Sequence, residues 1–451
     1  MNTYSGKVDD ECLDWNLKVD VRSHPDVLVV GGGAAGLAAS VAAAREGANV
    51  LLVEQLGFLG GTASSTTLGS VCGLFTVDGE TIKPVVEGFA KTFLAALRDK
   101  YDGASEPVRW LQTASVPYNP FLFSVAADDF LEQAGVKVLL HASAIDVVYD
   151  RHKNHIDSVL FSSHSGIWAV RPKIVIDCTG DGDIAARAGA DYDLELDSLQ
   201  FPTAMFECTG VDLEMVRKNT RDTVRKSLER AANAGHPLPR LSAGIFPTDR
   251  ATAHVNATRI QNIVTHKAPN PLDVEEMSTA ERAGRRQVLD YIEAFRQHMP
   301  GFANARISHA GATLGVRESR RIHGLYTLKD GDVLGAGRFE DVVACSAWPV
   351  EDHDSSGKTK WVWMEPGQYY QIPYRVLVPQ HVDNLLVAGR CVSATHTAQA
   401  SLRVVAVSMA LGEAAGTAAA HCVDSGVTPA EADVKRLQQR LRYHGAFLGG
   451  E

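Results

Sequence analysis

The chain has 451 residues, 45% hydrophobic and 22% charged, which is an ordinary globular composition on a chain too long for one hydrophobic core. Its formal net charge of −10 argues against nucleic acid as a main partner, because phosphate binding needs a basic surface. Seven cysteines without Cys-x-x-Cys spacing fit neither a zinc site nor a disulfide framework. We therefore expect no metal site, a reducing cytoplasmic location and, because apolar runs are short, no membrane span.

Residues 1–24 are predicted to be a polar extension that precedes a buried strand at residues 27–30. Gly31, Gly33 and Gly36 follow this strand in G-x-G-x-x-G spacing, and a helix of small residues comes next. Such a turn lets backbone N–H groups and the helix N-terminus approach a pyrophosphate. A second strand at 49–53 ends at Glu54, where a carboxylate can accept both ribose hydroxyls. These features predict a dinucleotide site and leave NAD and FAD open.

A loop rich in glycine and serine, residues 56–65, is too long for a plain link and is predicted to wrap a ligand. We expect a short helix at 128–135 and strands at 136–140 and 174–177, with a hairpin between them. The first part of the nucleotide-binding domain is therefore assigned to residues 25–195.

Residues 196–371 break this pattern with charged helices at 212–233 and 274–298, and we assign them to a substrate-covering cap domain. The first domain resumes over residues 372–425, with a strand at 385–388 and a helix at 401–420 crowded with small residues. Small residues permit close packing against a sheet or a cofactor. Residues 426–451 are expected to end the chain as a helix. The predicted class is α/β, a Rossmann-like domain assembled from N- and C-terminal segments with an inserted α+β domain.

The chain resembles the FAD-dependent oxidoreductases related to succinate dehydrogenase and fumarate reductase flavoproteins, within the glutathione-reductase-type FAD fold. The matching segments are VVGGGAAGLAA (29–39), LLVEQLGFLGGTAS (51–64), VIDCTGDGDIAARAGA (175–190), GVRESRRIHG (315–324), IPYRVLVP (372–379) and NLLVAGRCVSATHTAQASLRVVAVSMALGEAAGTAA (384–419). Cys178 stands where the family usually has alanine, and this change keeps a small residue. The resemblance covers residues 25–435 and is specific for FAD, not for a substrate.

The resemblance implies FAD-binding roles for five groups of residues. They are the ADP-binding turn Gly31, Gly33, Ala35 and Gly36 with Glu54; the wrapping loop at Gly61 and Thr62; Ala144 beside adenine; Thr179, Gly180 and Asp183 along the pyrophosphate and ribose; and Gly389, Arg390, Leu402 and Arg403 toward the ribityl chain and the flavin. Arg403 and a helix N-terminus would favour the negative charge that a reduced flavin carries near its pyrimidine edge. A surface ion pair is the other interpretation of Arg403.

Four residues are predicted to act on the substrate, each with a structural alternative. Arg317 and Glu318 would bind or deprotonate it, or form an inter-domain ion network. Arg375 would clamp a carboxylate, or form a structural pair. His396 would take a proton as hydride leaves, or be a satisfied structural histidine.

Two further features remain open at this stage. Cys72 would touch or link to the flavin, or be a buried apolar cysteine. Trp348, Trp361 and Trp363, which lie in one segment with Tyr369 and Tyr370, would form a pocket wall or lid, or a packed interface.

We therefore predict an enzyme, an FAD-dependent oxidoreductase that moves hydride between flavin N5 and a small polar substrate, with a carboxylated one as an option. A non-redox flavoenzyme, an isomerase or lyase that uses FAD for charge or geometry, is the alternative. A tRNA-modifying or scaffold flavoprotein is a third, against which the negative charge argues. The sequence does not define the substrate, the electron acceptor, the direction, covalent FAD attachment or the oligomeric state, a homo-oligomer included.

Overall fold

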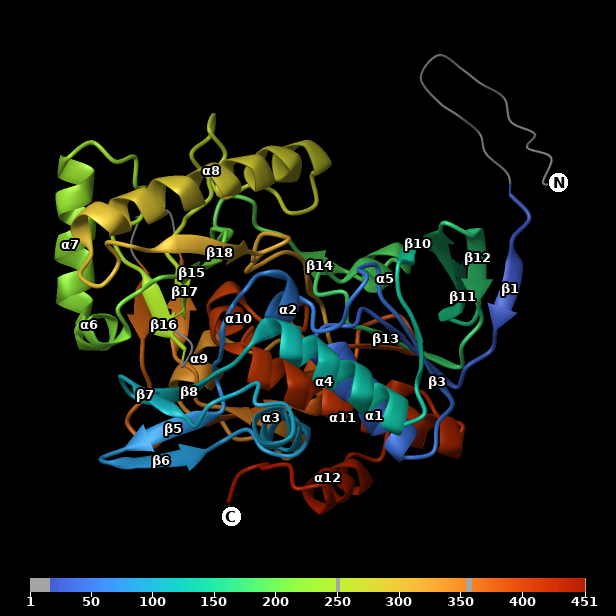
Figure 1. Ribbon diagram of the computed structural model, residues 1–451. Coiled ribbons are helices and arrows are strands. Elements are labelled where there is room, and N and C mark those ends of the chain that lie inside the picture. Colours follow the sequence, from blue (N-terminus) through green and yellow to red (C-terminus); the bar gives the residue numbers. More distant parts are fainter. Residues whose placement is uncertain (1–16, 249–251, 354–358, 451) are drawn as a thin grey trace.

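A computed structural model describes residues 17–248, 252–353 and 359–450 (Figure 1). Most of the expected polar extension lies outside these residues. Its end is not merely an extension, because Asp20–Ser23 form strand β1, which pairs in parallel with β12 (Gly166–Val170). Strand β12 continues antiparallel to β11 (His155–Ser163) and β11 to β10 (Ser143–Asp150), so the expected hairpin is present.

A five-stranded parallel sheet forms the centre of the first domain. Its strands are, in order, β24 (Leu385–Val387), β13 (Ile174–Asp177), β2 (Val27–Val30), β3 (Val50–Val53) and β9 (Lys137–Leu139). Strands β2, β3, β13 and β24 are buried along their whole length, as expected for apolar runs covered on both faces. The C-terminal strand β24 completes a sheet begun near the N-terminus, which confirms the predicted Rossmann-like architecture.

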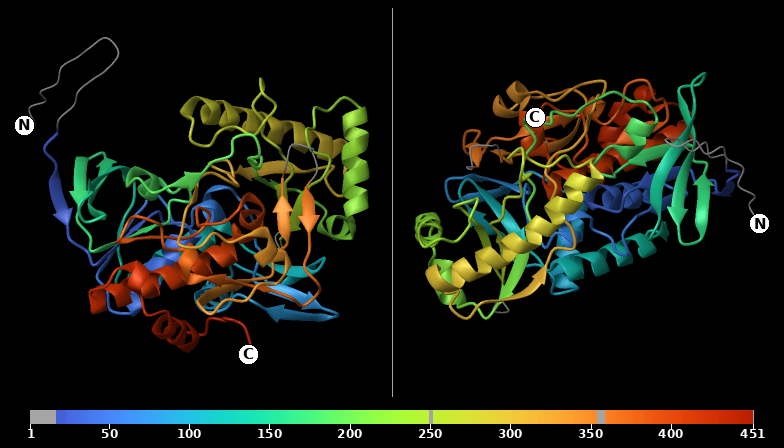
Figure 2. Two further views of the ribbon diagram at one scale, coloured as in Figure 1. Left: turned by 180° about the vertical axis from the view of Figure 1, so that it is seen from behind. Right: turned by 90° about the horizontal axis from the view of Figure 1, so that it is seen from above.

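Helix α1 (Ala34–Arg45) packs tightly against helix α11 (Val405–Ser425) beneath this sheet (Figures 1 and 2). A Cβ at Gly412 would clash with the carbonyl oxygen of Ala35, and one at Gly416 with that of Ala39. The two backbones therefore touch because α11 lacks side chains at these positions. The two glycines of the stripe face another helix, and α11 also packs against strands β13 and β24 of the sheet, as expected.

The helix expected at 401–420 is two helices. Helix α10 (His396–Leu402) ends at Leu402, and α11 leaves at 94° to it. Thr395 caps α10 by accepting a hydrogen bond from the Ala398 N–H, which fixes its start five residues before Ser401. The apolar pattern runs on through the break, so periodicity gives no sign of the bend.

In the described part of the chain, no single helix is long and apolar enough to cross a membrane. The bent pair of α10 and α11 passes that test by length and composition, but almost all of α11 is buried inside the protein.

Helix α4 (Pro120–Gln133) begins eight residues before the helix expected at 128–135. The Asn119 side chain caps it by accepting hydrogen bonds from the N–H groups of Phe121 and Leu122, and proline occupies its first position. The remaining elements of the first domain include α2 (Thr62–Ser65), β4 (Ser70–Val71), β5 (Phe75–Asp78), β6 (Thr81–Pro84), α3 (Phe89–Asp99), β7 (Val108–Trp110), β8 (Thr113–Pro117), α5 (Asp183–Arg187) and α12 (Val434–Tyr443).

The inserted domain is an antiparallel sheet covered by helices (Figure 1). Its strand order is β16 (Gly244–Pro247), β17 (Thr252–Asn256), β15 (Phe206–Thr209) and β18 (Arg306–Ala310). Helix α8 (Val274–His298) lies where a helix was predicted. The helix predicted at 212–233 is split into α6 (Leu213–Lys218) and α7 (Arg221–Asn233), because Thr220 caps a second start.

The second hydrophobic core is shorter than the cap domain assigned to residues 196–371. It extends from Phe206 to Ala305, whereas residues such as Ile322, Trp348 and Tyr370 pack into the first core. The pair β20 (Val342–Ser346) and β23 (Tyr370–Pro373) and the pair β21 (Val350–Asp352) and β22 (Lys360–Val362) follow the insertion. Of these short strands, β20, β21 and β22 lie within the residues assigned to the cap domain.

The contact between α1 and α11 predicts a stability effect. We expect Gly412→Val to lower the free energy of unfolding by about 1–3 kcal/mol, because the new side chain must push the Ala35 carbonyl away. Urea unfolding followed by circular dichroism measures the effect. The matched control is Gly331→Val in helix α9 (Asp330–Leu334), where a Cβ meets no atom within 4 Å. Equal losses in both variants would contradict the interpretation.

Candidate functional site

A cavity of about 1920 Å³ lies along the carboxyl edge of the parallel sheet and continues to the inserted domain. One end is lined by the turns that follow β2, β3, β13 and β24, and the other by α7, the segment before β16, and β17. Ligands of open α/β sheets bind at this carboxyl edge. A typical single-ligand pocket holds about 300–1000 Å³, so this cavity has room for a large cofactor and a second molecule.

The glycine turn at the start of α1 has the shape of a pyrophosphate cradle. Gly31 has a φ of +100°, a conformation that favours glycine, and a Cβ there would clash with Cys178. Gly33 faces open space, since a Cβ would approach only the Gly61 Cα, at 3.8 Å. Gly33 precedes α1 without a side chain to cap it, so N–H groups at the helix start are available to an anion.

Glu54, at the end of β3, is 6% exposed and lines the same end of the cavity. Its Oε2 accepts a hydrogen bond from the Gly32 N–H at 2.6 Å, and its Oε1 accepts one from the Leu56 N–H at 2.8 Å. Burial raises the pKa of this carboxyl group, which the backbone donors partly offset. Each oxygen keeps a lone pair for a ribose hydroxyl.

The turn after β13 is held by the buried carboxylate of Asp177. This group accepts hydrogen bonds from the Thr179 N–H and hydroxyl and from the N–H groups of Ile184 and Ala185, at 2.7 to 3.0 Å. Arg390 crosses the turn, and its guanidinium pairs with Asp181 at 2.9 Å. The predicted cofactor residues line the cavity with two exceptions: Gly36, where a Cβ would clash with the Gly31 carbonyl, and Leu402, which is buried in the core.

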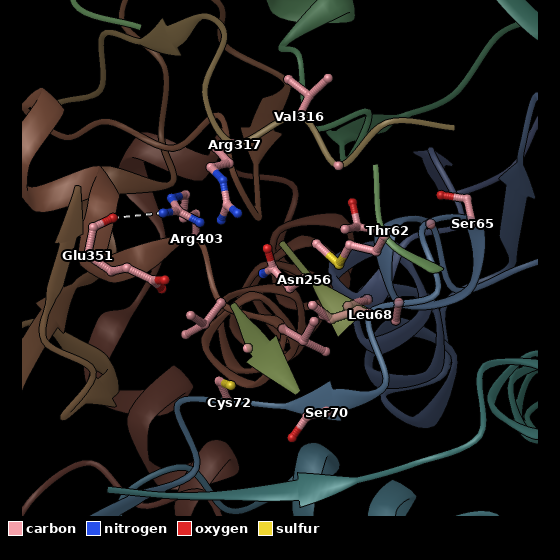
Figure 3. A pocket seen from close by; sticks show the side chains of 18 of the residues that line it. Thr62, Ser65, Leu68, Ser70, Cys72, Asn256, Val316, Arg317, Glu351 and Arg403 are labelled. Carbon is pink, nitrogen blue, oxygen red and sulfur yellow. Dashed lines mark hydrogen bonds between the residues drawn. The ribbon is translucent and has the colours of Figure 1, made fainter. Parts of the chain in front are cut away.

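Two arginines lie side by side toward the far end of the cavity (Figure 3). Arg403 is at the bend between α10 and α11 and donates to the Gln200 side-chain oxygen and the Glu351 carbonyl, both at 2.8 Å. Arg317 donates to the Phe201 carbonyl and the Thr203 hydroxyl. Burial lowers the pKa of both guanidinium groups, and the charge of Arg403 lowers that of Arg317 further.

The inserted domain adds Arg221 and Arg240 to the cavity lining. The Arg240 guanidinium donates to the Asn256 side chain at 3.0 Å, and Arg221 lies 4.8 Å from the ring centre of Trp110. Over the described ranges, none of these four arginines forms an ion pair with an acidic side chain. Glu351 is the carboxylate whose charge acts on all four.

Burial opposes the ionisation of Glu351, but a hydrogen bond with His353 and the charges of Arg403 and Arg317 lower its pKa to about 2. Glu351 therefore remains a carboxylate near neutral pH and balances part of the arginine charge.

Tryptophans form another wall of the cavity. Trp110 stacks on Trp348 with ring centres 6.1 Å apart and meets Trp361 edge-on at 5.2 Å. All three line the cavity, whereas Trp363 stacks behind Trp361. The expected aromatic segment thus contributes a pocket wall, and Tyr370 instead hydrogen-bonds Ser401 inside the core. Asp354 of that segment lies outside the described residues.

Cys72 also lines the cavity and is partly buried, and burial raises the pKa of its thiol. Contact with a bound flavin and a role as a packing residue are both compatible with this position.

His396 and Glu318 belong to a buried ion network and do not line the cavity. The His396 Nδ1 lies 2.9 Å from Glu318 and its Nε2 lies 3.5 Å from Asp352, while Glu318 also pairs with Arg321. Hydrogen bonding to Asp352 and Glu318 raises the pKa of His396 to about 10. A raised pKa favours the protonated ring at neutral pH, so the role of His396 as a proton acceptor stays a prediction, and the ion network describes its position.

Arg375 is likewise outside the cavity, in the turn after β23. Its guanidinium forms a two-point pair with Asp341, at 2.9 and 3.2 Å, and lies over the Tyr326 ring. This position fits the alternative interpretation of Arg375 as one half of a structural ion pair. It does not fit the predicted carboxylate clamp, which would have to face the cavity. Arg317 and Arg403 are arginines that do line the cavity.

The sequence analysis missed Trp110, Arg221, Arg240, Asn256 and Glu351. These residues are not part of any motif, and they meet only when β7, the inserted domain and β21 fold around one space. No local pattern in the sequence marks them.

The network around His396 predicts a pH dependence of stability. Because its pKa in the folded chain, about 10, exceeds the ordinary 6.5, the stabilisation is full below pH 6.5 and is lost as the pH rises through 10. We expect His396→Gln to lower the urea midpoint most at low pH, with the difference from wild type shrinking above pH 6.5. The exposed His152→Gln is the control. A difference that grows with pH would contradict this.

Comparisons with known proteins agree with the geometry. Similar solved structures include p-nitrophenol 4-monooxygenase PnpA from Pseudomonas putida DLL-E4, at 11% identity over 93% of this chain and 84% of that one, with a TM-score of 0.50. Another is a geranylgeranyl bacteriochlorophyll reductase-like protein from Thermoplasma acidophilum, at 13% identity over 93% and 83%, with a TM-score of 0.48.

At 11% identity, the likeness to the monooxygenase shows a similar fold and nothing more. None of the curated proteins matches the sequence. The profile of a family described as FAD dependent oxidoreductase matches residues 26–441. The chain belongs to this family of FAD-dependent oxidoreductases, and FAD is its cofactor.

Proposed function

We propose that the enzyme moves a hydride between a carboxylated organic substrate and N5 of FAD. The observation that carries the proposal is the pair formed by the buried Arg317 and the partly buried Arg403, which lie side by side at the cavity without an ion-paired carboxylate among the described residues (Figure 3). A guanidinium pair in a site of low dielectric constant is suited to bind a carboxylate by charge-assisted hydrogen bonds. The sequence suggests a small polar substrate that could carry a carboxylate, and the proposal retains this carboxylate.

The cofactor would be held along the sheet edge. The open cradle at Gly33 suits the pyrophosphate and Glu54 the ribose, while Arg390 supports the turn beside them. When bound, FAD supplies a two-electron acceptor or donor at N5.

The chain's own contribution at the flavin end is positive charge and exclusion of water. The resemblance puts the pyrimidine edge at the bend that carries Arg403, where α11 also begins without an acidic residue in its first turn. Positive charge there stabilises electron density that arrives with a hydride. The tryptophan wall keeps the reacting atoms away from bulk water, which strengthens these electrostatic effects.

Kinship with succinate dehydrogenase and fumarate reductase flavoproteins rests on the segments quoted above and is part of this proposal. A cytoplasmic location and an electron acceptor such as oxygen, a quinone or a protein carrier also stay predictions. The non-redox alternative predicts turnover in which the flavin never bleaches. Anaerobic mixing with a panel of carboxylates tests both, because bleaching of the flavin supports hydride transfer, and turnover without bleaching overturns it.

The cradle can be tested by filling it. Gly33→Val should fold, because a Cβ at this position meets only the Gly61 Cα, at 3.8 Å. It should bind FAD at least about tenfold more weakly, because the side chain would occupy the space proposed for the pyrophosphate. Visible absorbance of the purified variant and titration of the apoprotein with FAD measure the loss. A variant as yellow as the wild type would show that FAD does not contact this turn.

The arginine pair can be tested on the substrate. For a carboxylate that bleaches the flavin, Arg317→Gln should weaken binding about 10- to 100-fold, as expected for a lost hydrogen bond to a charged group. FAD content should be unchanged, and the corresponding neutral amide should lose far less affinity. The matched control is Arg375→Gln, which removes an arginine outside the cavity. Equal effects of both changes would overturn the assignment.

A further inference from the structure

Beside its arginines and a few other polar residues, the substrate end of the cavity has a large apolar surface. Leu238, Ile245 and Phe246 line it from the inserted domain, and Trp110 and Trp361 line it from the opposite side. A short dicarboxylate would leave this surface without a partner. The lining therefore fits a molecule that has an apolar body as well as a charge.

Positive charge predominates in this end. The charge of Glu351, whose low pKa keeps it ionised, acts on all four guanidinium groups. Glu229 and Glu281 of the inserted domain also line the cavity, but they pair with Arg225 and Arg285. The Nε of Arg403 is buried and, within the described ranges, has no hydrogen-bond partner. Glu351 offsets only part of the guanidinium charge, so the arrangement becomes more favourable when an anion enters.

The anion site and the aromatic wall are a fixed distance apart because of one strand pair. Arg403 donates to the Glu351 carbonyl on β21, and Glu351 lies directly opposite Trp361 on β22. Opposed residues of antiparallel strands are close neighbours. A molecule whose charged group reaches Arg403 and Arg317 therefore has its body beside Trp361.

The rings themselves favour a flat body. Trp110 and Trp361 meet edge-on, and the Arg221 guanidinium lies 4.8 Å from the centre of one and 5.9 Å from that of the other. Tryptophan edges and a stacked guanidinium plane attract the faces and edges of other aromatic rings. The Trp348 indole N–H, which is buried without a partner in the described structure, adds a donor at this wall.

We propose that the substrate is an aromatic carboxylate with its carboxylate at Arg317 and Arg403 and its ring system against Trp110 and Trp361. This rests on the proposed function for the reaction, but it concerns binding alone. It replaces the small polar molecule expected from sequence with an amphipathic anion.

The test is a binding comparison on the FAD-loaded protein. Naphthoate, naphthamide and succinate are titrated while flavin absorbance and tryptophan fluorescence are followed. Naphthoate should bind at least about tenfold more tightly than either of the others, because only it offers both a charge and a ring system. Succinate binding as tightly as naphthoate would overturn the aromatic body, and naphthamide doing so would overturn the anionic group.

Two comparisons locate the site, Trp361→Ala with Trp363→Ala and Arg221→Gln with Lys226→Gln, and Trp361→Phe is the conservative variant. Trp361→Ala should weaken naphthoate binding about tenfold, whereas Trp361→Phe should keep most of the affinity, and Trp363→Ala, which changes a tryptophan behind the wall, should have little effect. Arg221→Gln should weaken naphthoate more than Lys226→Gln, which removes the same charge from the outer side of α7. Equal losses within either pair would overturn the placement.

These outcomes are separate from those of the hydride proposal. Tight naphthoate binding together with a flavin that no carboxylate bleaches would overturn hydride transfer and support the ligand class. Bleaching by succinate but not by aromatic carboxylates, with succinate binding more tightly than naphthoate, would support hydride transfer and overturn the aromatic ligand class.

Discussion

The contact between the backbones of α1 and α11 is the constraint on which the rest of the molecule depends. Gly412 and Gly416 let the C-terminal helix lie against the helix that begins at the nucleotide turn. Because α11 is fixed there, its N-terminal end and the bend at Arg403 are fixed relative to Gly33. One helix pair thus sets the spacing between the cofactor cradle and the arginines of the substrate end. A bulkier residue at either glycine would shift both ends together.

Around this frame, polar contacts hold the arginines in place from behind. The Gln200 amide is buried and joins three segments, since it accepts a hydrogen bond from Arg403 and donates one to Gln399. Gln399 in turn donates to the backbone of Arg317, so the two guanidinium groups share one scaffold. The ion network of Glu318, His396 and Asp352 fixes α10 next to it. Of the residues expected to act on the substrate, Glu318 and His396 thus belong to this scaffold, whereas Arg317 lines the cavity.

The sequence predicts the parts of the molecule that depend on local geometry. The strand, the glycine turn and Glu54 follow one another within 30 residues, and their roles come from φ angles and helix ends that neighbouring residues determine. The substrate end depends on long-range packing, so Trp110 and Arg240 gave no signal. The bend after Leu402 was missed because apolar residues continue through it. His396 begins α10, close to Arg403 in the chain, but the two carboxylates beside it, which raise its pKa, are not revealed by spacing.

The four arginines make the cavity an exception in a protein whose formal net charge is −10. Over most of its surface the molecule repels anions, and at physiological salt that repulsion reaches only about 8 Å. Inside the cavity, walls of low dielectric constant concentrate the field of the guanidinium groups. An anion that collides elsewhere is turned away, and one that reaches the mouth is drawn inward. The uneven distribution of charge thus favours the encounters in which an anion reaches the arginines of the cavity.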